Sequence, residues 1–316
     1  MPDPVSRRTI LTGAAALVAL PAQALISDPG TASAVTDAAQ RFLSQADPAA
    51  RFPLSGEEPT RWHWTNIRRF PRNGQVLSSM DGTQRQAAMD LVDASLSPEG
   101  TVRARQIMAL ERLINRDPDA YYWSVFGEPG EGDWGWRLEG HHLSHHFRIS
   151  GDRVSPVPFF LGAWPNRGAD GRRPLGEIED LARDLVAGLP EDARRAAIVA
   201  DRARPGHVTG NASRASAPGL QGLNLSDAGA AAAGRDLAAT YLASLPKAQR
   251  DAALARATAG PMHLSWRGPL DVDRPHYWRL QGSAFTLEWD DTRNNSDHVH
   301  SVWRDYDADF DPSVGG

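Results

Sequence analysis

The sequence predicts an α+β fold in which helical hairpins flank an antiparallel or mixed sheet. Two observations carry this prediction. Three amphipathic segments repeat one pattern, in which an apolar stripe at helical spacing runs into a proline and then an Arg/Ala-rich stretch. Several aromatic segments instead alternate in the manner of strands. The chain has 316 residues, 41% of them hydrophobic and 23% charged, which is enough for a sizeable core.

The N-terminus has the features of an export signal. "SRRTILT" (6–12) places two arginines before an apolar run, and Ala22-Gln23-Ala24 follows as a cleavage site. This pattern resembles a twin-arginine signal. We therefore expect residues 1–24 to be removed after passage through the twin-arginine translocase, leaving a periplasmic or secreted protein with no stable membrane anchor. The resemblance also implies a chain that folds before export, often with a metal or cofactor.

The helical segments come first and continue between the strands. They read "MDLVDASLSPEGTVRARQIM", "LARDLVAGLPEDARRAAIVA" and "LAATYLASLPKAQRDAALAR". In the second, Leu181, Leu185 and Leu189 form one apolar face, and Pro190 stands where a first-turn proline is tolerated. Each segment predicts a helix-turn-helix hairpin. No break in composition divides the mature chain, so residues 25–316 are expected to form one domain, with a helical N-terminal layer up to about residue 118 as the alternative boundary.

The aromatic segments predict the strands. They cover residues 121–127, 133–149, 262–268, 276–290 and 298–305. Turn residues at 150–152 and around 294–295 predict hairpins. Residues 201–224 are rich in Gly, Ser, Ala and Pro and are expected to form a long surface loop that borders the site.

Composition excludes several kinds of site. The chain has no cysteine, which removes disulfides, zinc-thiolate sites, iron-sulfur clusters and thiol nucleophiles. Any metal must be held by His, Asp, Glu or backbone oxygen. The formal net charge is -5 and no basic stripe is present, so nucleic acid is not expected as a partner.

The segment "GHHLSHHF" (140–147) holds four of the ten histidines. On a strand, His142 and His146 share one face and His141 and His145 share the other. On a helix, the pairs would instead be 141 with 145 and 142 with 146, which is a common chelating spacing. The Trp-Gly-Trp sequence before the segment and the turn after it favour the strand.

A second polar cluster lies near the C-terminus. Glu288 stands on the polar face of one predicted strand, and His298 and His300 share a face of the next. Antiparallel pairing would bring the three together, and a histidine from the 140s would complete a site for a divalent transition metal (Cu, Zn, Fe or Mn). Two alternatives are a hydrogen-bonded acid/base site without metal, and Glu288 paired with Arg304 or Arg279 beside ordinary surface histidines.

Two charged residues follow the histidines on the same strand. Asp305 could accept an N–H bond from a metal-bound imidazole, and Arg304 could support the site or anchor an anionic substrate group. With Glu288 they are the candidate catalytic residues.

The segments "GHHLS", "PFFLG" (158–162), "SLP" (244–246), "HYWRLQGSAFTLEWD" and "HVHSVWRDYDADF" resemble the bacterial and fungal domain-of-unknown-function family numbered 3500, over nearly the whole mature chain. The family pattern implies the site residues Gly140, His141, His142, Glu288, Asp290, His298, His300, Arg304 and Asp305. It does not extend to His145 and His146, which become an accessory pair. The resemblance implies no particular reaction.

The sequence therefore predicts an exported metal-dependent enzyme that activates water or oxygen, with oxidation ranked ahead of hydrolysis. Its substrate would be a small or saccharide-like molecule. The alternative is a non-catalytic periplasmic protein that binds a metal or a carbohydrate. Several tryptophans lie beside the predicted site strands, either as core residues or as a stacking platform for a ligand. The expected metal ligands are His141, His142, Glu288, His298 and His300.

Overall fold

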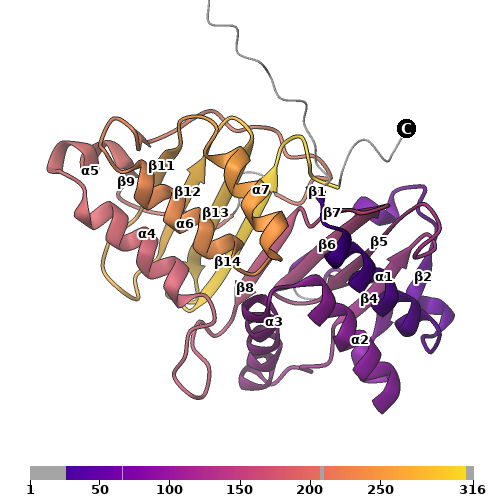
Figure 1. The fold of residues 1–316 in the computed structure, drawn as a ribbon. Coiled ribbons are helices and arrows are strands. Elements are labelled where there is room, and N and C mark those ends of the chain that lie inside the picture. Colours follow the sequence, from indigo (N-terminus) through magenta and orange to yellow (C-terminus); the bar gives the residue numbers. More distant parts are fainter. Residues whose placement is uncertain (1–25, 66, 207–209, 311–316) are drawn as a thin grey trace, which may run out of the picture.

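The computed structural model describes residues 26–65, 67–206 and 210–310. In this part of the chain a layer of helices packs against one large β-sheet (Figure 1). A 14-stranded sheet carries helices on one face, so the predicted α+β class is confirmed. The export signal predicted over residues 1–24 lies outside the described residues. Within the described ranges, no helix has both the length and the apolar character needed to cross a membrane.

The helices pair as the sequence predicts, because each predicted hairpin turns at its proline. Pro98 is the first residue of its helix, and Pro190 and Pro246 immediately precede theirs, where a missing N–H costs nothing. The described α-helices are α1 (Pro29–Leu43), α2 (Gly82–Ser95), α3 (Pro98–Leu110), α4 (Gly176–Gly188), α5 (Glu191–Ala197), α6 (Ala231–Leu242) and α7 (Lys247–Ala257).

The sheet contains more strands than the sequence predicts. Residues 133–149 form two antiparallel strands joined by a turn at 140–142, where one long strand was expected. The described strands are β1 (Ile26–Ser27), β2 (Arg51–Phe52), β3 (Gln75–Val76), β4 (Tyr122–Phe126), β5 (Asp133–Glu139), β6 (Leu143–Ser150), β7 (Arg153–Ser155), β8 (Phe159–Ala163), β9 (Ile198–Ala200), β10 (Leu223–Asn224), β11 (His263–Arg267), β12 (His276–Gln281), β13 (Phe285–Arg293) and β14 (His298–Asp305). The main path runs β10-β11-β12-β13-β14-β8-β6-β5-β4-β2.

The helices and the sheet enclose the main apolar core. Figure 1 shows α1–α3 over one half of the sheet and α4–α7 over the other. The tryptophans near the predicted site strands are buried in this core, so they stabilise the fold and offer no stacking platform to a ligand. They are Trp136, Trp266, Trp278, Trp289 and Trp303.

The other face of the sheet is polar and is covered by loops. Arg137 donates to the carbonyl of Glu58, and Arg304 donates to the carbonyl of Ala212 at 2.7 Å. Arg279 donates to the carbonyl of Gly219 at 3.2 Å. Through these bonds the backbone carbonyl groups of the loops accept hydrogen bonds from guanidinium groups that are buried on the sheet. The described residues of the predicted loop at 201–224, outside β10, therefore pack on the polar face of the sheet.

The two halves of the structure repeat one arrangement. A helical hairpin precedes a four-stranded meander in each half, α2–α3 before β4-β5-β6-β8 and α6–α7 before β11-β12-β13-β14. The second strands carry matching sequences, "WRLEG" (136–140) and "WRLQG" (278–282). The turns that follow close with the same bond, from Gly140 N to Leu143 O at 3.0 Å and from Gly282 N to Phe285 O at 3.1 Å. The meanders meet at the β8–β14 pair, in the centre of the sheet.

The side chain of His145 is buried in the core, and we therefore expect the stability of the fold to decrease at acidic pH. Its ring stacks on Phe159 at 4.2 Å, and burial lowers its pKa to about 3. The unfolded chain binds a proton here below pH 6.5, whereas the native chain does so only near pH 3, so stability falls as the pH falls between these values. Between pH 7.5 and pH 5 we expect wild type to lose roughly 2 kcal/mol more than a His145→Phe variant. Urea unfolding of metal-free protein at both pH values measures this, and equal losses would disprove it.

Candidate metal centre

Two histidines of the centre come from β14, which lies in the middle of the sheet between β13 and β8. His300 pairs directly with Gly162 on β8 and with Asp290 on β13. A register shift between Asp290 and Arg293 places His298 opposite Arg293. The irregular end of the β13–β14 hairpin therefore presents His298 and His300 next to each other above β8, with 3.1 Å between their Nε2 atoms.

A third histidine comes from the turn between β5 and β6. His142 has a φ of +70°, which is unusual for a residue with a side chain and stores strain. Its backbone is fixed on both sides, because its N–H donates to Trp64 O at 3.0 Å and its carbonyl accepts from Gly162 N at 2.8 Å. The hydroxyl of Tyr121 donates to the carbonyl of His141 at 2.6 Å. These bonds hold the strained turn in place.

Because of the strained turn, the side chains of the four histidines do not alternate between two faces of one strand as expected. His141 and His142 do not lie on opposite faces of a strand, because their rings stack at 3.6 Å. The Nε2 atom of His142 lies 2.8 Å from that of His298. Nitrogen ligands on one tetrahedral ion are about 3.3 Å apart, as follows from metal–nitrogen distances near 2.0–2.1 Å. The Nε2 atom of His298 thus lies at nearly the spacing of ligands to one ion from the Nε2 atoms of both His142 and His300.

Gly162 provides the space for this group. A Cβ atom at this position would lie 2.8 Å from His142 Cδ2 and 2.8 Å from the carbonyl oxygen of Val299. The second of these atoms is backbone and cannot move aside easily. A glycine opposite His300 is therefore needed for the three imidazoles to converge, which gives "PFFLG" a structural reason.

Two imidazoles of the centre, those of His142 and His298, are held in the neutral form. Burial lowers the pKa of His142 well below its usual range, and the neighbouring His141, His300 and His298 lower it further. Burial also lowers the pKa of His298 to about 3, followed by the effect of His141. The positive charge of Arg116 contributes to both shifts. Neutral imidazole is the form that binds metal, so protons compete little for these nitrogens.

The surroundings of the centre include three residues that the sequence analysis missed. Glu111 Oε1 lies 2.5 Å from His141 Nδ1, and both side chains are buried. Arg116 Nη1 lies 3.2 Å from the same nitrogen. Trp164 stacks on the ring of His298 at 4.9 Å and 3°. No local pattern marks these residues, although Glu111 directly follows α3.

The ligand atoms confirm a grouping that is suited to a metal. Among the described residues, His141, His142 and His298 offer ligand atoms that all lie within 4.8 Å of one another. His300 joins through its contact with His298. The structure therefore contains a histidine group positioned to hold a metal, as the sequence predicts. The predicted carboxylate, Glu288, is not in this group.

Glu288 shares a sheet face with His300 but has another partner. Its Oε1 accepts a hydrogen bond from the hydroxyl of Tyr277 at 2.5 Å, and the side chain is fully buried. It is not in the histidine group described above. Glu288 as a metal ligand stays a prediction from the sequence.

Arg304 and Asp305 contact structural partners at the far end of β14. Arg304 Nε bonds to Asp309 in a buried ion pair, and Asp305 accepts two bonds of 2.8 Å from Arg256. Arg304 lies four positions after His300, about 13 Å along a strand. The structure brings neither to the histidines, and their catalytic roles stay predictions.

A second group of possible ligands lies on the helix side of the sheet. Glu179, His276 and Asp291 are buried, and their ligand atoms lie within 4.8 Å of one another. Glu179 already pairs with Arg183 at 2.6 Å and with Arg173 at 3.2 Å. A cation would meet both guanidinium groups, so this group is a weaker candidate than the neutral histidines. Asp291 also accepts a bond from the N–H of His298 at 3.2 Å and thus helps to fix that ligand.

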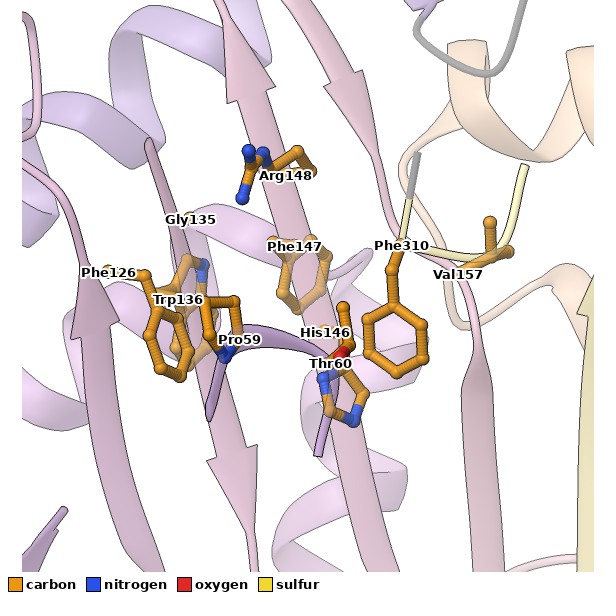
Figure 2. Close-up of a pocket in the computed structure, with 10 residues that line it drawn as sticks. All are labelled: Pro59, Thr60, Phe126, Gly135, Trp136, His146, Phe147, Arg148, Val157 and Phe310. Atoms are coloured by element: carbon orange, nitrogen blue, oxygen red, sulfur yellow. The ribbon is translucent and has the colours of Figure 1, made fainter. Parts of the chain in front are cut away.

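His146 lies at a separate small cavity, drawn in Figure 2. The cavity encloses about 30 Å³ and is lined by His146, Trp136, Phe147 and Phe310 among others. This volume suits one or two water molecules. The His146 Nε2 atom lies 3.0 Å from Ser144 Oγ. His145 in the core and His146 at this cavity both lie outside the histidine group.

Comparison with known families and proteins links most of the chain to one family of unknown function. The model of the family described as "Protein of unknown function (DUF3500)" matches residues 28–312. No curated protein and no solved structure matches the chain.

Proposed function

The chain belongs to the family of proteins of unknown function DUF3500, and we propose that it is a metal-dependent enzyme whose metal is held by His142, His298 and His300. The observation that carries the proposal is the convergence of three Nε2 atoms, 2.8 Å and 3.1 Å apart, from the β5–β6 turn and β14. Such close imidazoles are hard to maintain unless a shared cation or proton lies between them. The strain at His142 supports a functional reason for the arrangement.

Imidazole nitrogen suits Cu, Zn, Fe and Mn, and the chain has no sulfur ligand near the site that would select among them. Three neutral ligands leave the double charge of the ion uncompensated. An ion held this way would supply a Lewis acid for activating water, or a redox centre for oxygen if the metal is Cu, Fe or Mn. The identity of the metal therefore selects between hydrolysis and oxidation.

His141 and Glu111 have the arrangement of a proton-handling pair. The carboxylate of Glu111 accepts from Nδ1 of His141 and holds the ring in one tautomer, with Nε2 on the opposite side. His141 stacks on His142 and thus stands directly beside the metal ligands. In this position His141 can take up or release a proton next to the centre, or supply a fourth nitrogen. Trp164 covers the ring of His298 and limits the access of water.

The proposal includes export of the folded protein by the twin-arginine route, which the sequence of the first 24 residues supports. This route would allow the metal to be acquired in the cytoplasm. A metal bound there would reach the periplasm or the medium inside the folded chain.

The main competing function is a protein that only binds or stores a metal. An enzyme needs an open coordination position, whereas a storage site is closed. The test is to purify the exported protein, measure its metal content, and replace the metal with Co²⁺, whose visible spectrum reports added ligands. We expect about one metal per chain and a spectral change when azide is added.

Two results would contradict the enzyme proposal. Purified protein with no metal, and no uptake of Zn²⁺, Cu²⁺, Fe²⁺ or Mn²⁺ by the chelator-treated protein, would remove the metal centre. A Co²⁺ spectrum that azide leaves unchanged would indicate a closed site and favour storage. A Glu111→Gln variant is the matched comparison, because it alters the partner of His141 and leaves His142, His298 and His300 in place.

A further inference from the structure

A cavity of about 290 Å³ lies against His141, next to the candidate metal centre. Its walls come from residues 67–78 and from the segment 111–122 that follows α3. The polar side chains on its walls include Arg68, Ser78, Glu111, Asn115, Arg116 and Tyr122. The volume is close to the lower end of the range for small-molecule sites. Its ligand would be small.

Arg116 is the distinctive group of this cavity. It is half-buried, and its guanidinium lies over the ring of Trp164 at 5.2 Å. Its nearest polar neighbour on the centre side is His141, at 3.2 Å. The nearby carboxylate of Glu111 bonds to His141, and within the described ranges no carboxylate forms an ion pair with Arg116. A partly desolvated cation without a counter-ion is costly, and a bound anion would remove this cost.

The charge around the centre also favours an anion. Arg293, beside His300, is compensated by Asp290. A divalent ion would add two positive charges to that of Arg116, whereas the two acidic residues on the cavity wall, Glu111 and Asp117, already bond to His141 and to the N–H of Asp119. The region would therefore carry an excess of positive charge until a negatively charged molecule binds.

Two acidic residues limit what fits. Glu111 and Asp117 both line the cavity, and Asp117 is tied locally by the N–H of Asp119 at 2.9 Å. A large polyanion would meet these carboxylates, whereas one carboxylate or phosphate group placed at Arg116 would not. Tyr121, Tyr122, Ile67 and Val76 provide apolar contact for the rest of the molecule.

We propose that this cavity binds a small organic molecule bearing one carboxylate or phosphate group, which Arg116 holds through a forked pair of hydrogen bonds beside the metal centre. This inference rests on the proposed function in one respect, namely that the bound molecule is the substrate of the metal centre. The binding itself requires only Arg116 and the cavity.

The test is calorimetric titration of chelator-treated protein with benzoate, inorganic phosphate and benzamide. Benzamide has the shape of benzoate without its charge. We expect benzoate or phosphate to bind wild type in the millimolar range, benzamide not to bind, and Arg116→Gln to weaken anion binding at least about tenfold. Arg116→Lys should retain part of the affinity, because it keeps the charge and loses the planar fork. Arg105→Gln is the matched control, since Arg105 is an exposed arginine paired with Asp93 on the neighbouring helix.

The outcomes separate this inference from the proposed function. Anion binding that depends on Arg116 in the metal-free protein supports the cavity even if no metal ever binds. Stronger binding after metal loading supports the link between anion and metal. Equal affinity of wild type and Arg116→Gln, or no anion binding with and without metal, overturns the proposal. Which of benzoate and phosphate binds more tightly identifies the anionic group. Circular dichroism of each variant confirms that it is folded.

Discussion

A variant in which His298 and His300 are both alanine is expected to lose the metal. These residues supply two of the three Nε2 atoms that converge on β14 and the β5–β6 turn. The two imidazoles that remain, His142 and the neighbouring His141, do not hold a divalent ion as strongly as the full group. We expect the metal content of the purified variant to fall below roughly a tenth of the wild-type value. Elemental analysis after export and purification measures this directly.

The control for this experiment is His263→Ala. His263 lies at the start of β11, is partly exposed and lies on another strand from the centre. Its replacement should leave the metal content unchanged. Equal metal content in wild type and in the double variant would refute the centre proposed here. Unfolding curves of both proteins after chelator treatment show whether the double variant keeps the fold.

The second large effect is expected at Asp309. This residue neutralises Arg304, whose side chain is fully buried and also donates to the carbonyl oxygens of Gly210 and Ala212. Asp309→Ala leaves a buried guanidinium without its counter-charge, and we expect a loss of about 3–5 kcal/mol in the free energy of unfolding. Burial raises the pKa of Asp309 to about 6, so the measurement belongs at pH 8, where the carboxylate is charged. Urea unfolding gives the value.

Asp307→Ala provides the comparison for Asp309. Asp307 is mostly exposed and pairs with Arg256 at 3.4 Å, so its loss should cost less than about 1 kcal/mol. Equal small effects at both positions would mean that Arg304 is not held by a buried pair. Arg304 would then again be a candidate for binding substrate, as the sequence suggested. A metal content that stays at the wild-type level in Asp309→Ala would separate the stability effect from the centre.

The sequence predicted the parts of the fold that depend on local pattern. Alternation placed His298 and His300 on one face of one strand, and the prolines placed the turns of the helical hairpins. The same logic failed at His141 and His142, because alternation holds only while the backbone stays extended. A positive φ at His142 turns its ring toward His298. A non-glycine residue in this conformation gives no signal in a single sequence.

Other parts of the site could not be predicted because they depend on distant contacts. Glu111 and Arg116 follow a helix whose packing against the turn is not encoded in local spacing. Glu288 was expected among the histidines. In the structure its carboxylate accepts a hydrogen bond from Tyr277 on β12, and its role as a metal ligand stays a prediction. The similarity of "WRLEG" and "WRLQG" was present in the sequence and would have indicated the repeated halves. That similarity also shows where the halves differ, since His141 and His142 stand where Ser283 and Ala284 stand.

The position of the histidines at the junction of the two repeated halves has a mechanical consequence. His142 belongs to the first meander, and His298 and His300 belong to the second. An ion shared by all three would cross-link segments about 156 residues apart in the chain. It would tie the halves at the β8–β14 junction, where they are otherwise joined by backbone pairing and core packing. The two halves would then separate only after the ion had dissociated. We therefore expect the chain to unfold in one cooperative step with metal bound and in several smaller steps without it.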